Sequence, residues 1–333
     1  MTNRKYLFPA IAVLAVVTLS PLSSAAQATV PLHMVVTAES TKEDASPAIL
    51  DRRDVMVKQG KDRLQVTDWI PARGEQAGLQ LFVLIDDTCD TSLGGHLDDL
   101  RAFIAAQPIA TAIAIGYMRN ANVNVVQDFT TDHEKAARAL RLPLGTLSSQ
   151  DSPYLSLTSL LQRWPESKLR REVLMISDGI DRLRGYAPTA PSRVGPARAT
   201  STTMLYISPD VETASDASQK SGVIVHSIYA PGVGRAHRNF YEAQNGLNGL
   251  SKLSDETGGE AFYLTAQNPV SYKPYIDRLQ VILDNQYFLV FLAKPQKKAG
   301  FQRIKIDTEV PGIEFVAADY VWVPAPGNAA SKK

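Results

Sequence analysis

The sequence has few of the residues that build covalent or metal-bound centres. It holds one cysteine, Cys89, in 333 residues, which excludes an internal disulfide framework and a thiolate-ligated zinc or iron–sulfur site. Its five histidines are scattered, and none stands in an HExxH-type spacing. Basic and acidic residues nearly balance, at 35 Lys plus Arg against 34 Asp plus Glu. Because nucleic-acid-binding domains usually carry a basic excess, the composition predicts no nucleic-acid partner.

Long apolar runs are missing except near the N-terminus. There, an apolar stretch from Tyr6 to Leu19 follows Arg4 and Lys5 and precedes an A-x-A pattern at 26–28. These are the parts of a secretory signal peptide. We therefore expect residues 1–28 to be cleaved and the protein to be exported, periplasmic or secreted, with an uncleaved anchor as the alternative. No later stretch reaches the ~18–20 apolar residues of a membrane helix, so no membrane span is expected after cleavage.

The two ends of the remaining chain favour β structure. Residues 29–50 are largely polar and aperiodic and are predicted to be a flexible lead-in. Residues 51–78 contain two alternating stretches around Gly60, which predict a β-hairpin. Residues 287–324 contain strand patterns without intervening helices, and we expect them to pack with 51–78, because an unpaired strand edge is a liability. Residues 325–333 are predicted to be a disordered tail.

The central part, residues 79–286, alternates strand and helix patterns. Continuous apolar runs such as 81–85 and 173–176 indicate strands buried on both faces. This rhythm predicts an α/β fold of three layers, a doubly wound and mainly parallel sheet between helices, with a small antiparallel β module formed from both termini. A loop over about 182–208 interrupts the rhythm, and we expect it to be disordered or solvated.

Two carboxylate-bearing turns follow strands of the predicted sheet. Residues 86–92 read Asp-Asp-Thr-Cys-Asp-Thr-Ser, and residues 178–181 read Asp-Gly-Ile-Asp. In an open α/β sheet, ligands bind outside the carboxyl ends of the strands. Hard cations take oxygen ligands gathered in a compact cluster. The two turns are therefore a candidate cation site.

The order of these motifs resembles the von Willebrand factor type A domain. An apolar strand leads into D-x-[ST]-x-x at residue 86, [ST]-D-G-x-D follows at 177–181, and residues 253–262 run from a leucine through Thr-Gly-Gly to an aromatic strand. The flanking segments resemble the secreted bacterial "VWFA-related" group described from Acidobacteria, at 57–61, 286–289 and 301–306. The resemblance covers about residues 50–324 and implies the α/β fold just described.

The resemblance also implies a metal-ion-dependent adhesion site that holds one divalent cation, usually Mg²⁺. In that family, a partner's carboxylate often completes the coordination. Asp86 matches the first aspartate of the family motif, Thr88 the first serine and Asp178 the third-loop aspartate. Two positions depart: Asp90 stands where a second serine is expected, and Ser152 is the nearest hydroxyl to the expected second-loop threonine.

The departure at Asp90 changes the charge of the site. An extra carboxylate cancels part of the cation's surplus charge, so an acidic partner gains less, and Ca²⁺ or Mn²⁺ can compete with Mg²⁺. Without a cation, Asp86, Asp90 and Asp178 would repel one another and at least one pKa should rise. Two alternatives stay open: a cation site, or a degenerate site without a cofactor in which Thr88 and Ser92 cap the next helix.

The leading functional hypothesis is an exported, non-enzymatic interaction module. It would bind another protein, through an acidic side chain of that partner, at the carboxyl edge of the α/β sheet. The alternative is a metal-free structural or assembly factor that works through its β module. A hydrolase is disfavoured, because no GxSxG or similar nucleophile motif exists, and Cys89 has no base beside it in sequence.

Overall fold

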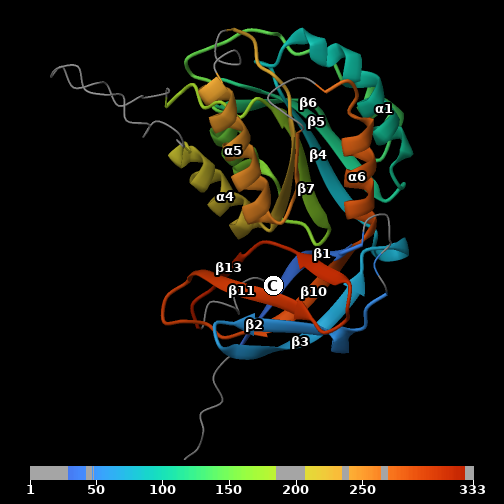
Figure 1. Cartoon of the computed structure of the whole chain (residues 1–333), viewed down its shortest axis with the longest axis vertical. Coiled ribbons are helices and arrows are strands. Elements are labelled where there is room, and N and C mark those ends of the chain that lie inside the picture. Colours follow the sequence, from blue (N-terminus) through green and yellow to red (C-terminus); the bar gives the residue numbers. More distant parts are fainter. Residues whose placement is uncertain are drawn as a thin grey trace, which may run out of the picture.

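The computed structural model describes residues 29–42, 47, 49–184, 207–234, 240–263 and 269–326. The predicted signal peptide at 1–28, most of the loop at 182–208 and most of the tail at 325–333 lie outside these residues. The described chain forms two lobes, an α/β lobe and a β module (Figure 1). Within the described part, no helix has the length and apolar character needed to cross a membrane.

The α/β lobe is built on a six-stranded sheet. The strands, in their order across the sheet, are β6 (Asn122–Thr130), β5 (Thr111–Arg119), β4 (Leu79–Asp86), β7 (Arg170–Ser177), β8 (Val223–Tyr229) and β9 (Ala261–Phe262). All neighbours are parallel except β6, which runs antiparallel to β5. When the six strands are numbered 1 to 6 along the chain, they lie across the sheet in the order 3-2-1-4-5-6 of a doubly wound fold. The order in which the chain adds strands reverses between β4 and β7.

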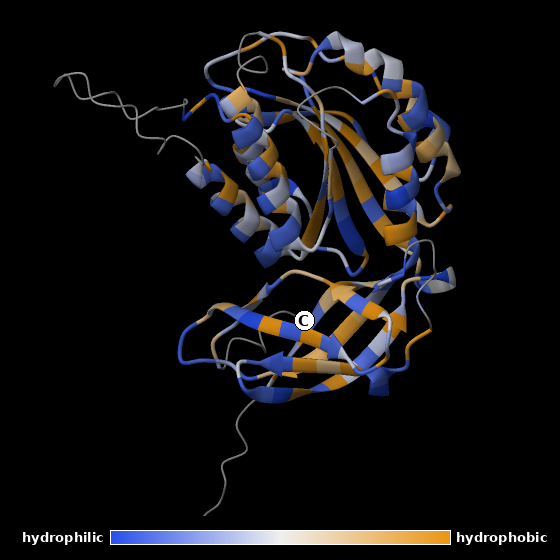
Figure 2. Cartoon of the chain, in the orientation of Figure 1, coloured by the Kyte–Doolittle hydropathy of each residue, from blue (hydrophilic) through white to orange (hydrophobic). Residues whose placement is uncertain are grey.

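Helices cover both faces of this sheet (Figure 1). They are α1 (Leu97–Ala106), α2 (His133–Arg138), α3 (Pro153–Arg163), α4 (Pro209–Ser221), α5 (Phe240–Thr257) and α6 (Lys273–Asp284), with short 3-10 helices η1 (Arg52–Asp54), η2 (Gly74–Gln76) and η3 (Thr91–His96). Odd-numbered β4 residues such as Leu81 pack with α1, α2 and α6. Even-numbered ones such as Phe82 pack with α3, α4 and α5. Both faces of β4 are therefore buried, which explains its unbroken apolar run (Figure 2).

The β module is a seven-stranded antiparallel sheet. Its strands, in their order across the sheet, are β12 (Ile313–Val316), β1 (Val30–Ser40), β10 (Gln286–Ala293), β3 (Asp62–Pro71), β2 (Val55–Gln59), β11 (Gly300–Thr308) and β13 (Tyr320–Val323). The hairpin β2–β3 lies between β10 and β11, so the predicted module made from both termini is confirmed. Its core includes Trp69, which stacks on Tyr287 at 4.4 Å between ring centroids.

The predicted flexible lead-in at 29–50 is wrong for residues 30–40. Val30–Ser40 forms β1, which pairs with β10 from Val30 to Thr37 and with β12 from Thr37 to Ser40. Val36 is fully buried in the module core, while Leu32 and Met34 pack against it. This period-two pattern belongs to a half-buried strand, but Pro31 and the polar residues after Ser40 obscure it in the sequence.

Candidate functional site

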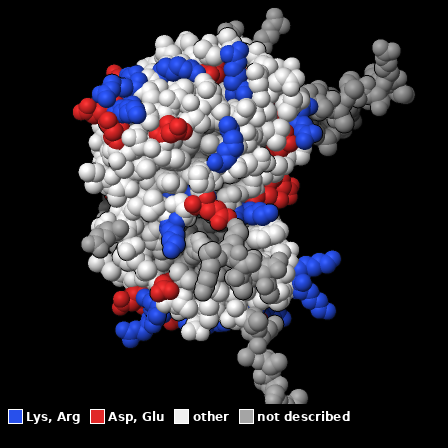
Figure 3. All heavy atoms as spheres, turned by 180° about the vertical axis from the view of Figure 1, so that it is seen from behind, with Lys and Arg blue, Asp and Glu red and all other residues white. Residues whose placement is uncertain are grey.

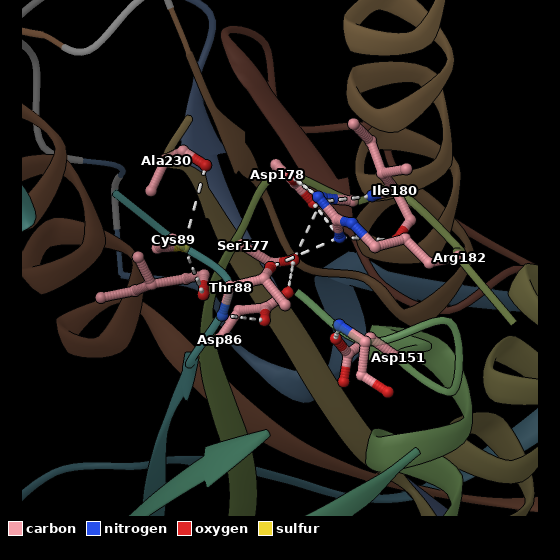
Figure 4. Close-up of polar contacts among 12 residues, drawn as sticks. Asp86, Thr88, Cys89, Asp151, Ser177, Asp178, Ile180, Arg182 and Ala230 are labelled. Atoms are coloured by element: carbon pink, nitrogen blue, oxygen red, sulfur yellow. Dashed lines mark hydrogen bonds and ion pairs between the residues drawn. The ribbon is translucent and has the colours of Figure 1, made fainter. Parts of the chain in front are cut away.

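The predicted site lies at the point where the order of the α/β sheet reverses. Asp86 is the last residue of β4, Ser177 is the last residue of β7, and Asp178 follows directly. β4 and β7 pair in parallel up to Ile85 and Ile176, so their carboxyl ends lie side by side. In doubly wound folds, ligands bind in the crevice outside this reversal. The structure thus brings Asp86 and Asp178 to the same edge (Figure 4).

Asp86 is held by two hydrogen bonds. Its Oδ1 accepts from the backbone N–H of Thr88 at 2.9 Å, and its Oδ2 accepts from the Ser177 hydroxyl at 2.7 Å. Only 3% of the residue is exposed. Burial, and next the negative charge of Asp178, raise the pKa of the Asp86 carboxyl to about 6. The pKa rise that charge repulsion predicts falls on Asp86, where burial is the larger cause and the charge of Asp178 the second.

The positive charge at this edge comes from Arg182. Its Nη2 lies 2.5 Å from Oδ2 of Asp178, and its Nη1 donates to Oδ1 of Asp178 and to Oγ1 of Thr88, at 3.3 Å each. Figure 4 shows the guanidinium lying against Asp178 and Thr88. The side chain is 11% exposed. Burial alone would lower the pKa of Arg182, but the charge of Asp178 raises it above its ordinary value, so the group stays charged.

The arrangement does not fit a divalent cation while Arg182 is in place. The guanidinium already contacts Asp178 and Thr88, two of the oxygen donors that a cation would need. Among the residues that the structure describes, no group of three or more His, Cys, Asp or Glu side chains is placed to hold a metal ion. The cation implied by the resemblance therefore stays a prediction, and the geometry favours the degenerate alternative.

The two residues that depart from the family pattern make capping contacts. The Asp90 side chain accepts a hydrogen bond from the backbone N–H of Ser92 at 2.8 Å and is the N-cap of η3. The Ser152 hydroxyl accepts from the backbone N–H of Leu155 at 3.3 Å and is the N-cap of α3. Such contacts satisfy helix N–H groups that have no partner within the helix. The degenerate-site alternative predicted that Thr88 and Ser92 would cap the next helix. In the structure, the side chain that caps η3 is that of Asp90.

Three residues that matter here were not among the predicted site residues. Arg182 falls in the loop expected to be solvated, yet its side chain is almost buried. The Asp151 carbonyl accepts from the backbone N–H groups of Arg182 and Leu183 at 2.9 Å each, and so fixes the start of that loop. Gly232 leaves room for the ion pair, because a Cβ atom there would lie 2.0 Å from Oδ2 of Asp178. The only feature of the sequence that could have indicated this ion pair is the four-residue spacing from Asp178 to Arg182.

Cys89 lies beneath this edge as a buried side chain. Its sulfur lies 3.9 Å from the carbonyl oxygen of Ile176 and 3.8 Å from that of Ala230. Burial, followed by the charge of Asp86, raises the pKa of the thiol well above its ordinary value. Because the thiolate is the nucleophilic form of cysteine, this environment does not activate Cys89.

A loop with exposed leucines borders the site. Leu142, Leu144 and Leu147 are 48%, 48% and 46% exposed. The loop is fixed to the first turn, because Arg141 pairs with both carboxylate oxygens of Asp87 at 2.7 and 2.9 Å. The Asp87 carboxylate also accepts from the backbone N–H of Leu144 at 3.1 Å. The leucines are therefore presented on an anchored loop.

The raised pKa of Asp86 predicts a pH effect on stability. The folded-state value of about 6 exceeds the ordinary 3.8, so the folded protein binds this proton more tightly. The stabilising contribution is complete below about pH 4 and is lost as the pH rises through about 6. The free energy of unfolding should fall by about 3 kcal/mol over this window through Asp86 alone.

Asp86→Asn tests this prediction, because it keeps the shape and the Oδ1 acceptor but cannot titrate. Denaturant titrations between pH 4 and 7 should show a shallower fall for Asp86→Asn than for the wild type. Asp68→Asn, at an exposed position of β3, serves as the control and should follow the wild type. Parallel pH curves for the wild type and Asp86→Asn would show that Asp86 titrates at its ordinary pKa.

No protein-family model and no curated protein matches the chain. Several solved structures are similar at low identity. BatB from Bacteroides thetaiotaomicron is 10% identical over 62% of this chain and 97% of its own, with a TM-score of 0.42. The von Willebrand factor type A protein from Catenulispora acidiphila is 8% identical over 93% and 77%, at 0.39. Manganese-loaded TRAP from Plasmodium vivax is 10% identical over 75% and 96%, at 0.37.

These likenesses are remote, and the strand order, the two helix layers and the two aspartate turns define the class of fold. They give the larger lobe a doubly wound α/β fold, which is the fold implied by the sequence resemblance to the von Willebrand factor type A domain. In this protein, that α/β lobe is joined to an antiparallel β module that both ends of the described chain build together.

Proposed function

We propose that this chain is an exported, non-enzymatic module for adhesion or assembly that binds another protein at the carboxyl edge of its α/β sheet. The observation that carries the proposal is the leucine loop, Leu142 to Leu147, anchored beside a buried, charge-balanced centre. Clustered exposed apolar side chains mark interaction sites on soluble proteins. An anchored loop also loses less conformational entropy on binding than a mobile one.

The charges at this edge favour a contact without a metal. The positive charge of Arg182 is balanced by the carboxylate of Asp178. The Asp86 carboxyl has a pKa of about 6 and adds negative charge when it ionises. Little positive charge is therefore left to attract an acidic side chain of a partner. We therefore propose an apolar contact, with Mg²⁺, Ca²⁺ or Mn²⁺ and an acidic partner side chain as the alternative. Elsewhere, basic and acidic side chains stand beside one another on the face shown in Figure 3. That mixture supports a protein partner rather than a nucleic acid.

Export is part of the same proposal. It rests on the charged, apolar and A-x-A segments of residues 1–28, which lie outside the described residues. Protein recovered from the envelope or the medium should begin at or near Thr29 when its N-terminus is sequenced. Recovery of the intact N-terminus from a membrane fraction would instead identify an uncleaved anchor.

The leucine loop provides the test of the contact surface. Cross-linking in the envelope fraction should capture a partner with the wild type. The double variant Leu144→Glu/Leu147→Glu should capture at least about 90% less of that partner, because charged groups at an apolar contact cost well over 1 kcal/mol of binding free energy. Ile109→Glu is the matched control: Ile109 is 85% exposed and precedes β5, at the opposite edge of the sheet. If the wild type, the leucine double variant and Ile109→Glu all captured the partner equally, the contact would lie away from the leucine loop. The alternative, in which the protein works through its β module, requires that result.

A further inference from the structure

A groove separates the two lobes on the side where β1 and β13 face the α/β lobe. It encloses about 240 Å³. Its lining comes from β1 at residues 31–35, from the segment 167–171 that leads into β7, from the end of α4 and the start of β8 at 219–224, and from β13 at 320–322. It lies at the amino end of β7, so it is distinct from the Arg182 edge at the carboxyl end.

One wall of this groove is a strand edge without a neighbour. β1 pairs with β10 from Val30 to Thr37, but β12 covers its other side only from Thr37 onward. Among the described strands, none pairs with residues 30–36 on that side. β13 lines the opposite wall, and it too ends the sheet, because it pairs with β11 alone.

The backbone direction of β1 can be assigned along this open edge. The N–H of Ala38 donates to the carbonyl of Asn285 at 2.9 Å, on the β10 side. Because N–H groups alternate in direction along a strand, those of His33 and Val35 point to the open side. Pro31 has no N–H to offer there, which limits pairing at the start of the strand.

The groove is basic. Its lining includes His33, Lys168, Arg171 and Lys220, and no aspartate or glutamate is found among its described lining residues. Lys220 Nζ lies 4.6 Å from the centre of the Trp322 ring, which adds an apolar surface beside the charge. Glu166, whose charge acts on Arg171, is not part of the lining.

We propose that this groove binds an extended, acidic peptide segment of a partner protein, which adds to the free edge of β1 as a further strand. Main-chain hydrogen bonds to His33 and Val35 supply the pairing, as in other cases where a peptide extends a sheet. Carboxylates on the peptide face Lys168 and Lys220, and its apolar side chains contact Trp322. This site is independent of the leucine loop proposed above.

The first test uses a fluorescent peptide of about six residues with alternating valine and glutamate, close to the length of the open edge. Fluorescence anisotropy with the purified protein should show saturable binding that weakens with salt. A valine–lysine peptide and a proline-interrupted valine–glutamate peptide should not bind. Binding should also change the emission of Trp322, since Trp69 and Trp164 are buried. Trp322→Phe should lose most of that change while the anisotropy signal persists.

Variants separate charge recognition from strand pairing. Lys168→Glu with Lys220→Glu should weaken binding at least about tenfold, whereas Lys135→Glu, an exposed change on α2, should not. Val35→Pro removes a donor on the open side only and should abolish binding, with the melting temperature confirming that the protein is folded. Leu144→Glu/Leu147→Glu should bind the peptide as the wild type does.

Three results would overturn the proposal. The first is equal affinity for the glutamate and lysine peptides. The second is undiminished binding by Val35→Pro. The third is wild-type dimerisation without peptide, measured by sedimentation, that Val35→Pro abolishes, because a second copy of the chain would then occupy the edge.

Discussion

Replacing Arg182 by alanine should lower the free energy of unfolding by about 3–5 kcal/mol at neutral pH. Removing one partner of a buried ion pair leaves the other charge without compensation. Here, the carboxylate left behind is Asp178, which is fully buried and repels Asp86. Chemical denaturation followed by circular dichroism measures the loss. Arg138→Ala is the matched control: its ion pair with Glu134 has the same four-residue spacing but is exposed, so less than about 1 kcal/mol should be lost.

The same variant decides between the two alternatives for the site. Without Arg182, oxygen atoms of Thr88 and Asp178 are freed beside Asp86, so millimolar Mg²⁺, Mn²⁺ or Ca²⁺ should raise the melting temperature of Arg182→Ala. A cation at a hundredfold excess over its Kd stabilises by about 2.7 kcal/mol. The wild type should show no shift, and Asp178→Ala added to Arg182→Ala should abolish the gain. A shift of the wild type that Asp178→Ala removes would mean that the guanidinium moves aside and the cation site is functional.

The position of the site could be predicted from the sequence, but the group that supplies its positive charge could not. Asp86 and Asp178 both follow apolar runs, and the carboxyl ends of buried parallel strands meet at one edge, so their proximity follows from local patterns. Arg182 gives no such signal, because an arginine in a polar loop is usually solvated. Its burial depends on the Asp151 carbonyl and on Gly232, which come from other parts of the chain. Only the folded arrangement shows that a side chain supplies the positive charge.

The same contrast holds for the β module. The hairpin at β2–β3 and the C-terminal strands could be assigned to one sheet, because neither set had another partner in the sequence. β1 could not, although its residues alternate, because Pro31 weakens the strand pattern and the strands that stabilise it follow far later in the chain. Strand formation depends on burial against neighbours more than on intrinsic preference. The lead-in was therefore misassigned where that context was missing.

Deleting residues 29–40 should disrupt the β module rather than trim a flexible segment. β1 is the strand between β12 and β10, so its loss removes the pairing of β12 and exposes the edge of β10. Hydrogen exchange should become faster by orders of magnitude in β12 and β10, because protection follows the free energy of local opening. Protection in β4 and β7, which belong to the other sheet, provides the internal reference.

A point substitution gives the same test without shortening the chain. Val36 is fully buried in the core of the β module, and Val36→Asp places a carboxylate there without a partner, which should cost at least about 3 kcal/mol. Val126→Asp is the matched control, because Val126 lies 39% exposed on β6. If both the deletion and Val36→Asp left the exchange of β10 and β12 unchanged, residues 29–40 would be dispensable and the flexible lead-in would be the correct description. The groove proposed above would then lose one of its walls, because the edge that accepts the peptide exists only while β1 is paired with β10.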